Sequence, residues 1–276
     1  MAVVNTNIAS SVAQAALAKN ERSLNTAMEQ LSTGKRINSA ADDSSGLAIS
    51  ARMTSQIRGL ETAVRNANDA ISMVNTAEGA LDEMTEMLQR IRELAVQSGT
   101  GTTHADDRTY MDAEFNALRD EIDRIASNTE WNGNTILDGT ADGATSNVVY
   151  QVGVDGGNTL SVNFGNFTSG NATTSGLHNL TLDATTVASG IAKASSVILE
   201  ADVSIAAVSN QRATFGATSN RLTHAVDNLT SVKTNAEASR SRILDTDYAA
   251  ATSELARTQI IQQAGTAMLA QANQLP

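Results

Sequence analysis

The chain has 276 residues, no Cys and a net charge of −11. These features exclude disulfides and thiolate metal sites, and the acidic balance argues against nucleic acid as the main partner. No run approaches the ~18–20 apolar residues that a membrane-spanning helix needs, so no membrane association is predicted. Aromatic residues make up only 3% of the chain while hydrophobic residues reach 41%, which favours long helices packed side by side.

The first segment, residues 1–43, begins without charged side chains, since no Asp, Glu, Lys or Arg precedes Lys19. It lacks the basic and apolar stretches of a secretory signal peptide, and we expect none. Val4, Ile8 and Val12 are set among Asn, Ser, Thr and Gln, so a helix here carries one narrow apolar stripe. Such a helix buries too little by itself to offset its ordering entropy. We therefore expect it to be unstructured in the lone molecule and to fold against a partner.

The longest regular pattern covers residues 53–95. Apolar residues recur there at alternating steps of four and three, which is typical of a coiled-coil seam and predicts a long helix. Ser39 with Asp42 predicts a capping box at its start, and Asp43 adds a negative charge that suits a helix N-terminus. The Gly-containing run 98–101 predicts the end of the helix.

Two further helices are predicted by the same spacing. The first begins at a capping box of Thr103 and Asp106 and continues over 111–125. The second covers 198–236, although polar residues interrupt its apolar ladder. Three helices with matching seams predict one elongated bundle. The expected core residues of this bundle are Ile57, Leu60, Val64, Ile71, Leu88, Ile91, Leu118, Ile122, Ile205, Val208, Leu222 and Leu229.

Residues 131–190 differ in composition, because they hold ten of the 18 Gly residues. Dipeptides of the Asn-Gly and Asp-Gly type, such as that at 132–133, mark turns. Alternating apolar residues over 148–154 and 160–164 predict one β-hairpin. The remaining stretch, 166–190, is rich in Ser, Thr, Gly and Asn, and we expect loops and short strands there.

The last segment resembles the first in composition, because no charged residue follows Arg257 and isolated apolar residues lie among polar ones. We expect the two ends of the chain to pair with each other as helices. The predicted fold class is therefore mainly α: an elongated helical bundle or coiled-coil rod with paired terminal helices and a small tip that contains the β-hairpin. The expected parts are a terminal helical domain of 1–43 with 240–276, a helical rod of 44–131 with 190–239, and a variable outer region of 132–189.

Several long stretches resemble the signature sequences of bacterial flagellin, the filament subunit of the flagellum. They are NTNIASSVAQ at 5–14, LSTGKRINSAADDSSGLAIS at 31–50, QRIRELAVQ at 89–97 and SRILDTDYAAATSELARTQIIQQAGTAMLAQANQ at 241–274. The resemblance implies a structural protein, not an enzyme, that polymerises with copies of itself outside the cell and serves swimming motility. It also implies type III export, an export chaperone, and cap and junction proteins as partners.

In such a filament, the resemblance implies that the charge-free ends form an inner tube, that the rod forms the next layer and that 132–189 faces outward. When each subunit binds the next through two different surfaces and the row does not close into a ring, it continues as a helical polymer. The expected subunit contacts are Val4, Ile8, Val12, Leu24, Leu31, Leu255, Ile260, Ile261, Met268 and Leu269. The turn that joins the layers, either a hydrated loop or a transmitter of small shifts between them, contains Lys35, Arg36, Asn38 and Asp42.

A second surface is suggested by the motif at 89–97. Gln89, Arg90, Leu94 and Glu114 are candidate contacts of a vertebrate Toll-like receptor, because the resemblance implies that a neighbouring subunit and this receptor use the same patch. The alternative is a solvated face of the bundle, on which exposed ion pairs contribute little.

Other classes of function find less support in the sequence. His104, His178 and His224 are scattered and match no metal-binding motif. The acidic pairs at 42–43 and 106–107 lie at predicted helix starts, where negative charge is favourable. No catalytic residue, cofactor site or metal site is therefore predicted.

Two alternatives stay open. The outer region is a candidate binding module, in which Tyr150, Phe164 and Phe167 are available to stack on a carbohydrate. A junction protein between hook and filament is a closer variant of the filament subunit.

The tripeptides at 166–168 and 171–173 match the pattern of N-glycosylation sites.

Overall fold

The computed structural model describes residues 7–168 and 175–274, which are mainly helical, as predicted. Contacts divide the chain into two compact units. We refer to residues 1–58 with 232–276 as the terminal unit and to residues 59–231 as the central unit. The elements in chain order are α1 (Ile8–Thr33), α2 (Ser44–Ser98), α3 (Ala105–Asn128), β1 (Glu130–Trp131), β2 (Asn134–Thr135), β3 (Asn147–Gln151), β4 (Thr159–Asn163), α4 (Ser175–His178), α5 (Val187–Leu244) and α6 (Tyr248–Gln274).

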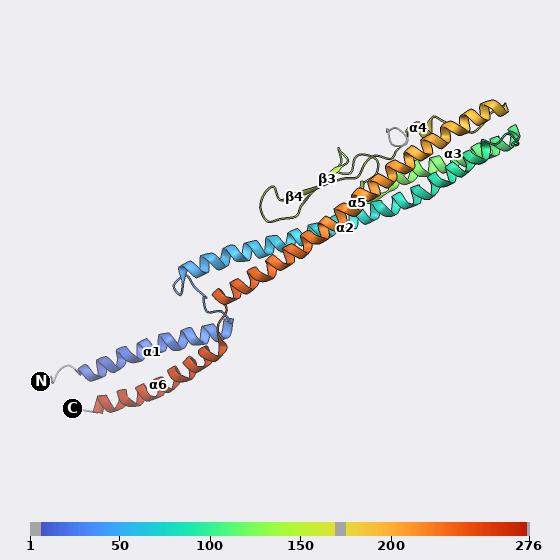
Figure 1. Ribbon diagram of the computed structural model, residues 1–276. Helices are drawn as coiled ribbons and strands as arrows, with labels where there is room; N and C mark the ends of the chain where they lie inside the picture. Colours follow the sequence, from blue (N-terminus) through green and yellow to red (C-terminus); the bar gives the residue numbers. More distant parts are fainter. Residues whose placement is uncertain (1–6, 169–174, 275–276) are drawn as a thin grey trace. The chain divides into compact units, whose positions relative to one another are not determined.

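In the terminal unit, α1 and α6 lie side by side, which confirms that the two ends of the chain pair as helices (Figure 1). Asn20 Nδ2 donates to the carbonyl oxygen of Thr258 at 2.8 Å and to Gln262 Oε1 at 3.1 Å. Asn7 Nδ2 donates to the carbonyl oxygen of Ala272 at 3.0 Å. Residues early in α1 thus meet residues late in α6, so the pair is antiparallel.

Two connections lead from this helix pair to α2 and α5, and hydrogen bonds join them. Gly34, with φ 70°, ends α1 in the left-handed conformation that glycine adopts readily. The amide of Arg36 donates to the carbonyl oxygen of Leu244 at 2.7 Å, and the amide of Thr246 donates to that of Gly34 at 3.0 Å. Arg36 Nη2 also donates to the carbonyl oxygen of Ile243 at 2.7 Å. The two connections therefore form one hydrogen-bonded double segment.

The start of α2 differs from the prediction. The helix begins one residue after Asp43, whose Oδ1 accepts hydrogen bonds from the amides of Ser45 at 3.1 Å and Gly46 at 2.9 Å. The predicted capping box of Ser39 and Asp42 is wrong, because Asp42 Oδ2 accepts from the Ser39 amide at 2.8 Å and closes a turn that precedes the helix.

The start of α3 also lies beyond its predicted position. His104 precedes the helix, and its amide donates to Asp107 Oδ2 at 3.3 Å. The predicted capping box of Thr103 and Asp106 is therefore displaced by one residue. Asp106 and Asp107 both lie in the first turn, where a negative charge stabilises the N-terminus of a helix, as the sequence indicated.

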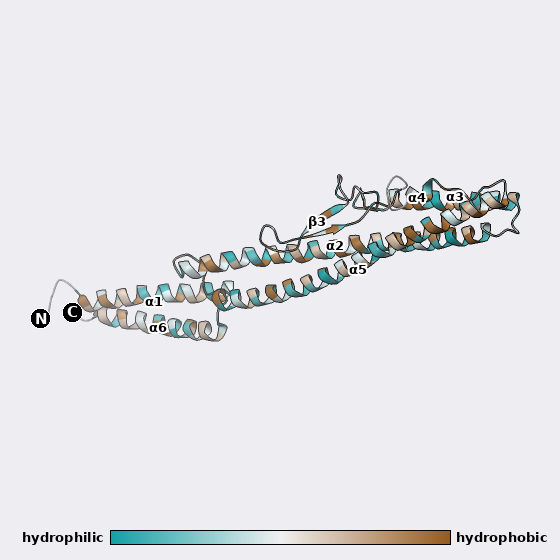
Figure 2. Ribbon diagram, turned by 45° about the horizontal axis from the view of Figure 1, so that its top comes forward, coloured by the Kyte–Doolittle hydropathy of each residue, from teal (hydrophilic) through white to brown (hydrophobic). Residues whose placement is uncertain are grey.

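The core of the central unit is the three-helix seam that the sequence predicts. Its large, fully buried side chains come from α2, α3 and α5 and include Leu81, Met84, Leu88, Ile91, Phe115 and Phe215. Figure 2 shows hydrophobic residues that recur between hydrophilic ones along these helices. Burial of each such side chain contributes about 1.5–3 kcal/mol before conformational entropy is counted, so this unit has a substantial core of its own.

The seam of α2 departs from the predicted one in its first half. Ala63 and Ala70 are buried, at 2% and 0% exposure, whereas Val64 and Ile71 beside them are only half-buried. A small side chain at the contact lets the neighbouring helix come closer, and the larger residue then lies at the edge of the seam. The other predicted core residues that are half-buried are Leu118, Ile205 and Leu229.

Arg108, in the first turns of α3, is fully buried. Its Nε donates to the carbonyl oxygen of Ser98, and its Nη2 donates to that of Thr100, both at 3.1 Å. Ser98 is the last residue of α2 and Thr100 follows it, so the guanidinium lies at the C-terminus of this helix, where a cation is favourable. Gly190 of α5 packs on the guanidinium, and a Cβ there would lie 2.6 Å from Nε. One side chain thus joins the end of α2 to the starts of α3 and α5.

The predicted β-hairpin is present as the antiparallel pair of β3 and β4. It is attached to the helices of the central unit. Tyr150 Oη donates to Met73 Sδ at 2.7 Å. Phe164, which follows β4, is fully buried, and its ring centroid lies 5.4 Å from that of Phe215 on α5.

A second, smaller hairpin, of β1 and β2, forms at the predicted turn. Asn132 and Gly133 have φ 52° and 82°, as a type I′ turn requires. The short strands expected within 166–190 are not found in its described part, residues 166–168 and 175–190, which contains α4 and the start of α5 instead. None of the described helices combines the length and the apolar character needed to cross a bilayer.

Candidate subunit-docking surface

Small and polar side chains hold the α1–α6 pair together. The most buried residues of the pair are Ser10, Asn20, Ala27, Ala251 and Thr258, each 9% exposed or less. Such residues let two helices approach closely, but they remove little apolar area from water. The larger apolar side chains of both helices therefore lie mostly outside the interface of the pair.

Five of the ten predicted subunit contacts are exposed side chains of this kind. Those with exposed fractions of 41% to 67% are Ile8, Val12, Ile260, Ile261 and Met268. Those that are half-buried are Leu24, Leu31, Leu255 and Leu269, and Val4 lies outside the described residues. Met28, 54% exposed, belongs to the same helix pair. It was not predicted, although its spacing of four residues from Leu24 and three from Leu31 could have indicated it.

An apolar groove of about 190 Å³ lies between the two helices. Its lining residues are Ala13, Ala16, Leu17, Ile261, Gly265 and Met268. Leu17 fits against the backbone of α6 because Gly265 has no side chain, and a Cβ there would lie 2.6 Å from Leu17 Cδ2. We call this groove, together with the exposed large apolar side chains of the predicted contacts on α1 and α6, the terminal apolar face; those side chains are Ile8, Val12, Ile260, Ile261 and Met268.

The terminal apolar face contains no titratable side chain. The nearest ion pair along α6 joins Arg257 Nε to Glu254 Oε2 at 2.9 Å, and this hydrogen bond lowers the pKa of Glu254. Because the face itself is neutral, a partner can cover it without the cost of removing a charge from water. The face is therefore suited to burial in an assembly.

The second predicted surface is only partly assembled by the structure. Arg90 of α2 reaches across to α3, where its Nε donates to Glu114 Oε1 at 2.9 Å, and its Nη1 pairs with Glu93 at 3.1 Å. The bond with Glu114 raises the pKa of Arg90 above its ordinary value. Gln89 is exposed beside them. Leu94 is different, because it is only 1% exposed and belongs to the core between the helices.

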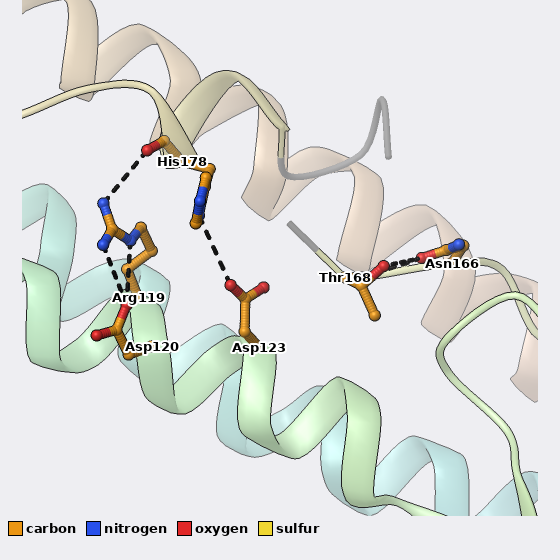
Figure 3. Close-up of polar contacts among 6 residues, drawn as sticks. All are labelled: Arg119, Asp120, Asp123, Asn166, Thr168 and His178. Carbon is orange, nitrogen blue, oxygen red and sulfur yellow. Dashed lines mark hydrogen bonds and ion pairs between the residues drawn. The ribbon is translucent and has the colours of Figure 1, made fainter. Parts of the chain in front are cut away.

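His178 and the first tripeptide of the glycosylation pattern, 166–168, are engaged in local contacts (Figure 3), while the second tripeptide, 171–173, lies outside the described residues. His178 Nδ1 lies 3.6 Å from Asp123 Oδ2, and its carbonyl oxygen accepts a hydrogen bond from Arg119 at 3.2 Å. Thr168 Oγ1 donates to Asn166 Oδ1 at 2.8 Å, so the first tripeptide forms a closed turn. Within the described ranges, no three His, Asp or Glu side chains gather as a metal site.

The aromatic side chains proposed to stack on a carbohydrate are not available for it. Phe164 and Phe167 are 0% and 2% exposed. Tyr150 is half-buried against α2, and its pKa is raised to about 12, first by burial and then by the charge of Asp69. All three rings are used to attach the outer region to the helices.

Comparison with known proteins agrees with this arrangement. Residues 4–142 match the model of the bacterial flagellin N-terminal helical region, and residues 198–276 match that of the C-terminal helical region. A flagellin of Bacillus subtilis (strain 168) is 43% identical, with 99% of this chain and 97% of the relative covered. Flagellin A of Vibrio cholerae is 34% identical over the same shares of the two chains.

Solved structures give the same assignment. The crystal structure of Bacillus cereus flagellin is 34% identical, covers 60% of this chain and 88% of its own, and superposes with a TM-score of 0.51. A putative flagellar hook-associated protein from Vibrio parahaemolyticus, 16% identical with a TM-score of 0.60, shares the fold alone. The chain belongs to the bacterial flagellin family, whose members are structural proteins, not enzymes, that polymerise into the extracellular filament of the flagellum.

Proposed function

We propose that the terminal apolar face is the surface through which copies of this chain stack in the filament. The observation that carries the proposal is the mismatch within α1 and α6: small and polar residues form their mutual interface, while large apolar residues remain 41% to 67% exposed. Each of these side chains contributes about 1.5–3 kcal/mol when a partner covers it completely. The subunit contacts are then Val4, Ile8, Val12, Leu24, Leu31, Leu255, Ile260, Ile261, Met268 and Leu269.

Assembly through this face couples the ordering of α1 and α6 to their contact with neighbouring copies. A helix pair with so small an apolar interface gains little free energy in isolation, whereas ordering its backbone costs about 1–2 kcal/mol per residue. Contacts with neighbouring copies supply the missing apolar burial. The ordering cost therefore limits spontaneous polymerisation of free subunits and favours addition to an existing filament end.

The family membership also supports a layered arrangement of the subunit. In this proposal, residues 1–43 with 240–276 form the inner tube, residues 44–131 with 190–239 form the surrounding layer, and residues 132–189 face outward. An export chaperone covers the apolar ends before type III export, and cap and junction proteins contact the chain during and after assembly. The closeness of the chain to flagellins favours a filament subunit over a hook–filament junction protein.

Deletion of residues 1–40 tests the proposal. We expect a soluble, helical monomer that forms no filaments when it is seeded with fragments of wild-type filament and imaged by negative-stain electron microscopy. A finer test replaces Val12 and Ile260 by Asp, with Ser11→Asp as the matched control, since Ser11 is an exposed polar residue of the same helix. Filaments formed by the truncated chain at the wild-type rate would contradict the role of the terminal apolar face.

A second role is recognition by a vertebrate Toll-like receptor, supported by the exposed cluster of Gln89, Arg90 and Glu114 within the motif that the resemblance singles out. We expect Arg90→Ala with Glu114→Ala to reduce receptor signalling in reporter cells. The matched control is Arg124→Ala, because Arg124 forms a comparable exposed pair with Glu121 on α3. Equal signalling from all three proteins would exclude this cluster as a receptor contact.

A further inference from the structure

A cleft of about 500 Å³ lies in the terminal unit, outside the terminal apolar face. Its lining residues are Lys35, Ile37, Asn38, Leu47, Ser50, Ala51, Thr54, Ser55, Arg58 and Leu244. The six residues of α2 among them follow the spacing i, i+3, i+4, i+7, i+8 and i+11, so one face of the helix forms a wall of the cleft. Small side chains dominate this wall and leave room for a second helix to approach.

The lining of this cleft is basic. Lys35 and Arg58 are its charged residues, and no acidic residue is among the ten described residues that line it. Asp245 follows the lining residue Leu244 and Glu61 lies one helical turn after Arg58, but neither lines the cleft, and Asp42 and Asp43 accept hydrogen bonds before and at the start of α2. Apolar Ile37, only 2% exposed, lies among the lining residues. The cleft therefore suits a segment that combines aliphatic groups with carboxylates.

The chain itself provides such a segment, because its charge is divided unequally between the two units. Residues 1–58 and 232–276 carry 10 Lys or Arg against 8 Asp or Glu, a net charge of +2. Residues 59–231 carry 9 against 22, a net charge of −13. The stretch 66–89 of α2 alone contains five acidic residues and no basic one.

Not all of these acidic residues need an outside partner. Arg212 of α5 pairs with Asp82 at 2.8 Å and with Glu78 at 4.0 Å. Glu83 and Glu86, in contrast, are exposed and lie three residues apart on the outer face of α2. Gly79, one turn earlier, faces open space, so this part of the helix surface is unobstructed among the described residues.

We propose that the basic cleft receives the acidic outer face of α2 from a second copy of this chain, with Glu83 and Glu86 of the second copy opposite Lys35 and Arg58. The proposal rests on the assembly proposed above and adds a polar contact to it. The contact joins two different surfaces of the chain. A row of subunits therefore has a free cleft at one end and a free acidic face at the other, so it can grow without closing into a ring. Opposite charges at such a contact set the register and speed the encounter of subunits.

The test measures seeded elongation of full-length chains by light scattering, with electron microscopy of the products. Each variant elongates from sheared fragments of its own filaments, or from wild-type fragments if it forms none. We expect Lys35→Glu with Arg58→Glu to slow elongation about tenfold, a change that corresponds to ~1.4 kcal/mol. Arg52→Glu is the matched control, since Arg52 is an exposed cation of the same helix outside the cleft.

The decisive variant combines both sides of the contact. Glu83→Lys with Glu86→Lys should slow elongation like the cleft variant, and the fourfold variant with all charges exchanged should return to within about threefold of the wild type. A role of these residues in subunit folding alone predicts no such rescue, and circular dichroism of the monomers verifies that each variant is folded.

Two outcomes would overturn the proposal: elongation of the cleft variant at the rate of Arg52→Glu, or failure of the fourfold variant to recover although it is folded. Failure of the assembly proposal is distinguishable from both. In that case the chain lacking residues 1–40 forms filaments, whatever the charge variants do.

Discussion

The terminal and central units each contain part of α2 and α5, but they differ in what their helices bury. In the central unit, α2, α3 and α5 enclose large side chains such as Leu88 and Phe215, which are fully buried. In the terminal unit, the most buried positions of the helix pair hold Ser, Asn, Ala and Thr. Because apolar burial is the main source of folding free energy, we expect the central unit to be stable within one chain, and we propose that the terminal unit gains its stability from other copies.

The largest difference is expected when one apolar residue of each unit is shortened. Leu88→Ala should lower the free energy of unfolding of the monomer by about 2–5 kcal/mol, because it leaves a cavity among three helices. Val12→Ala, at a residue 63% exposed, should change it by less than ~0.5 kcal/mol. Urea unfolding followed by circular dichroism measures both. Equal losses would mean that the terminal unit has a core of its own.

Arg108 gives the next largest effect within the central unit. Arg108→Ala leaves the buried carbonyl of Ser98 and the partly buried carbonyl of Thr100 without their donor, and we expect a loss of about 2–3 kcal/mol in the free energy of unfolding. Gly190→Ala should act in the same direction, because its Cβ would lie 2.6 Å from Arg108 Nε. Thermal unfolding measures these losses. Wild-type stability of both variants would show that the guanidinium does not join the three helices.

A smaller effect is expected at the one buried amide side chain of the described α1–α6 interface. Asn20→Ala removes the bonds to Thr258 and Gln262, and should weaken the helix pair by about 1 kcal/mol. Hydrogen exchange of filaments should show faster exchange in α1, with α3 unchanged as the internal reference. Unchanged exchange in α1 would mean that the Asn20 bonds do not stabilise the helix pair and that contacts with other copies alone do so.

The smallest effect concerns pH at the start of α2. The bond from the Gly46 amide, followed by that from the Ser45 hydroxyl, holds the pKa of Asp43 below its ordinary 3.8. The folded state thus favours the ionised carboxylate, so its contribution is complete above about pH 3.8 and is lost as the pH falls through the lowered value. Amide chemical shifts of Ser45 and Gly46 should follow this titration. Asp43→Asn, which retains an acceptor, should abolish it.

Much of the fold could be predicted from periodicity. On the three bundle helices, apolar residues recur every three or four residues, and in β3 and β4 they alternate with polar ones. These spacings predict which side chains face a neighbouring element, and the structure confirms most of them. The spacings fail where Ala replaces a larger residue, as at Ala63 and Ala70, because a small side chain carries little hydrophobic signal. Helix starts were misplaced by a few residues, because several Ser, Thr and Asp residues near one end compete for the capping position.

The candidate site was predicted less completely. The apolar residues at the chain ends could be recognised, but their exposure depends on which face α1 turns toward α6, and that choice is made by polar residues such as Asn20. The burial of Leu94 follows from its place in the seam between α2 and its neighbours. No local pattern signals the burial of Arg108, because its partners are the backbone carbonyls of Ser98 and Thr100, whereas Asp106 and Asp107 beside it in sequence suggest an ordinary exposed charge.

The hydrogen-bonded double segment beside α1 and α6 has a mechanical consequence. Since the amides of Arg36 and Thr246 bond across from one connection to the other, a pull on either chain end is divided between two polypeptide strands rather than borne by one. A connection of two hydrogen-bonded strands also resists twisting better than a single loop, so we expect α1 and α6 to stay coupled to α2 and α5 when the subunit is under load.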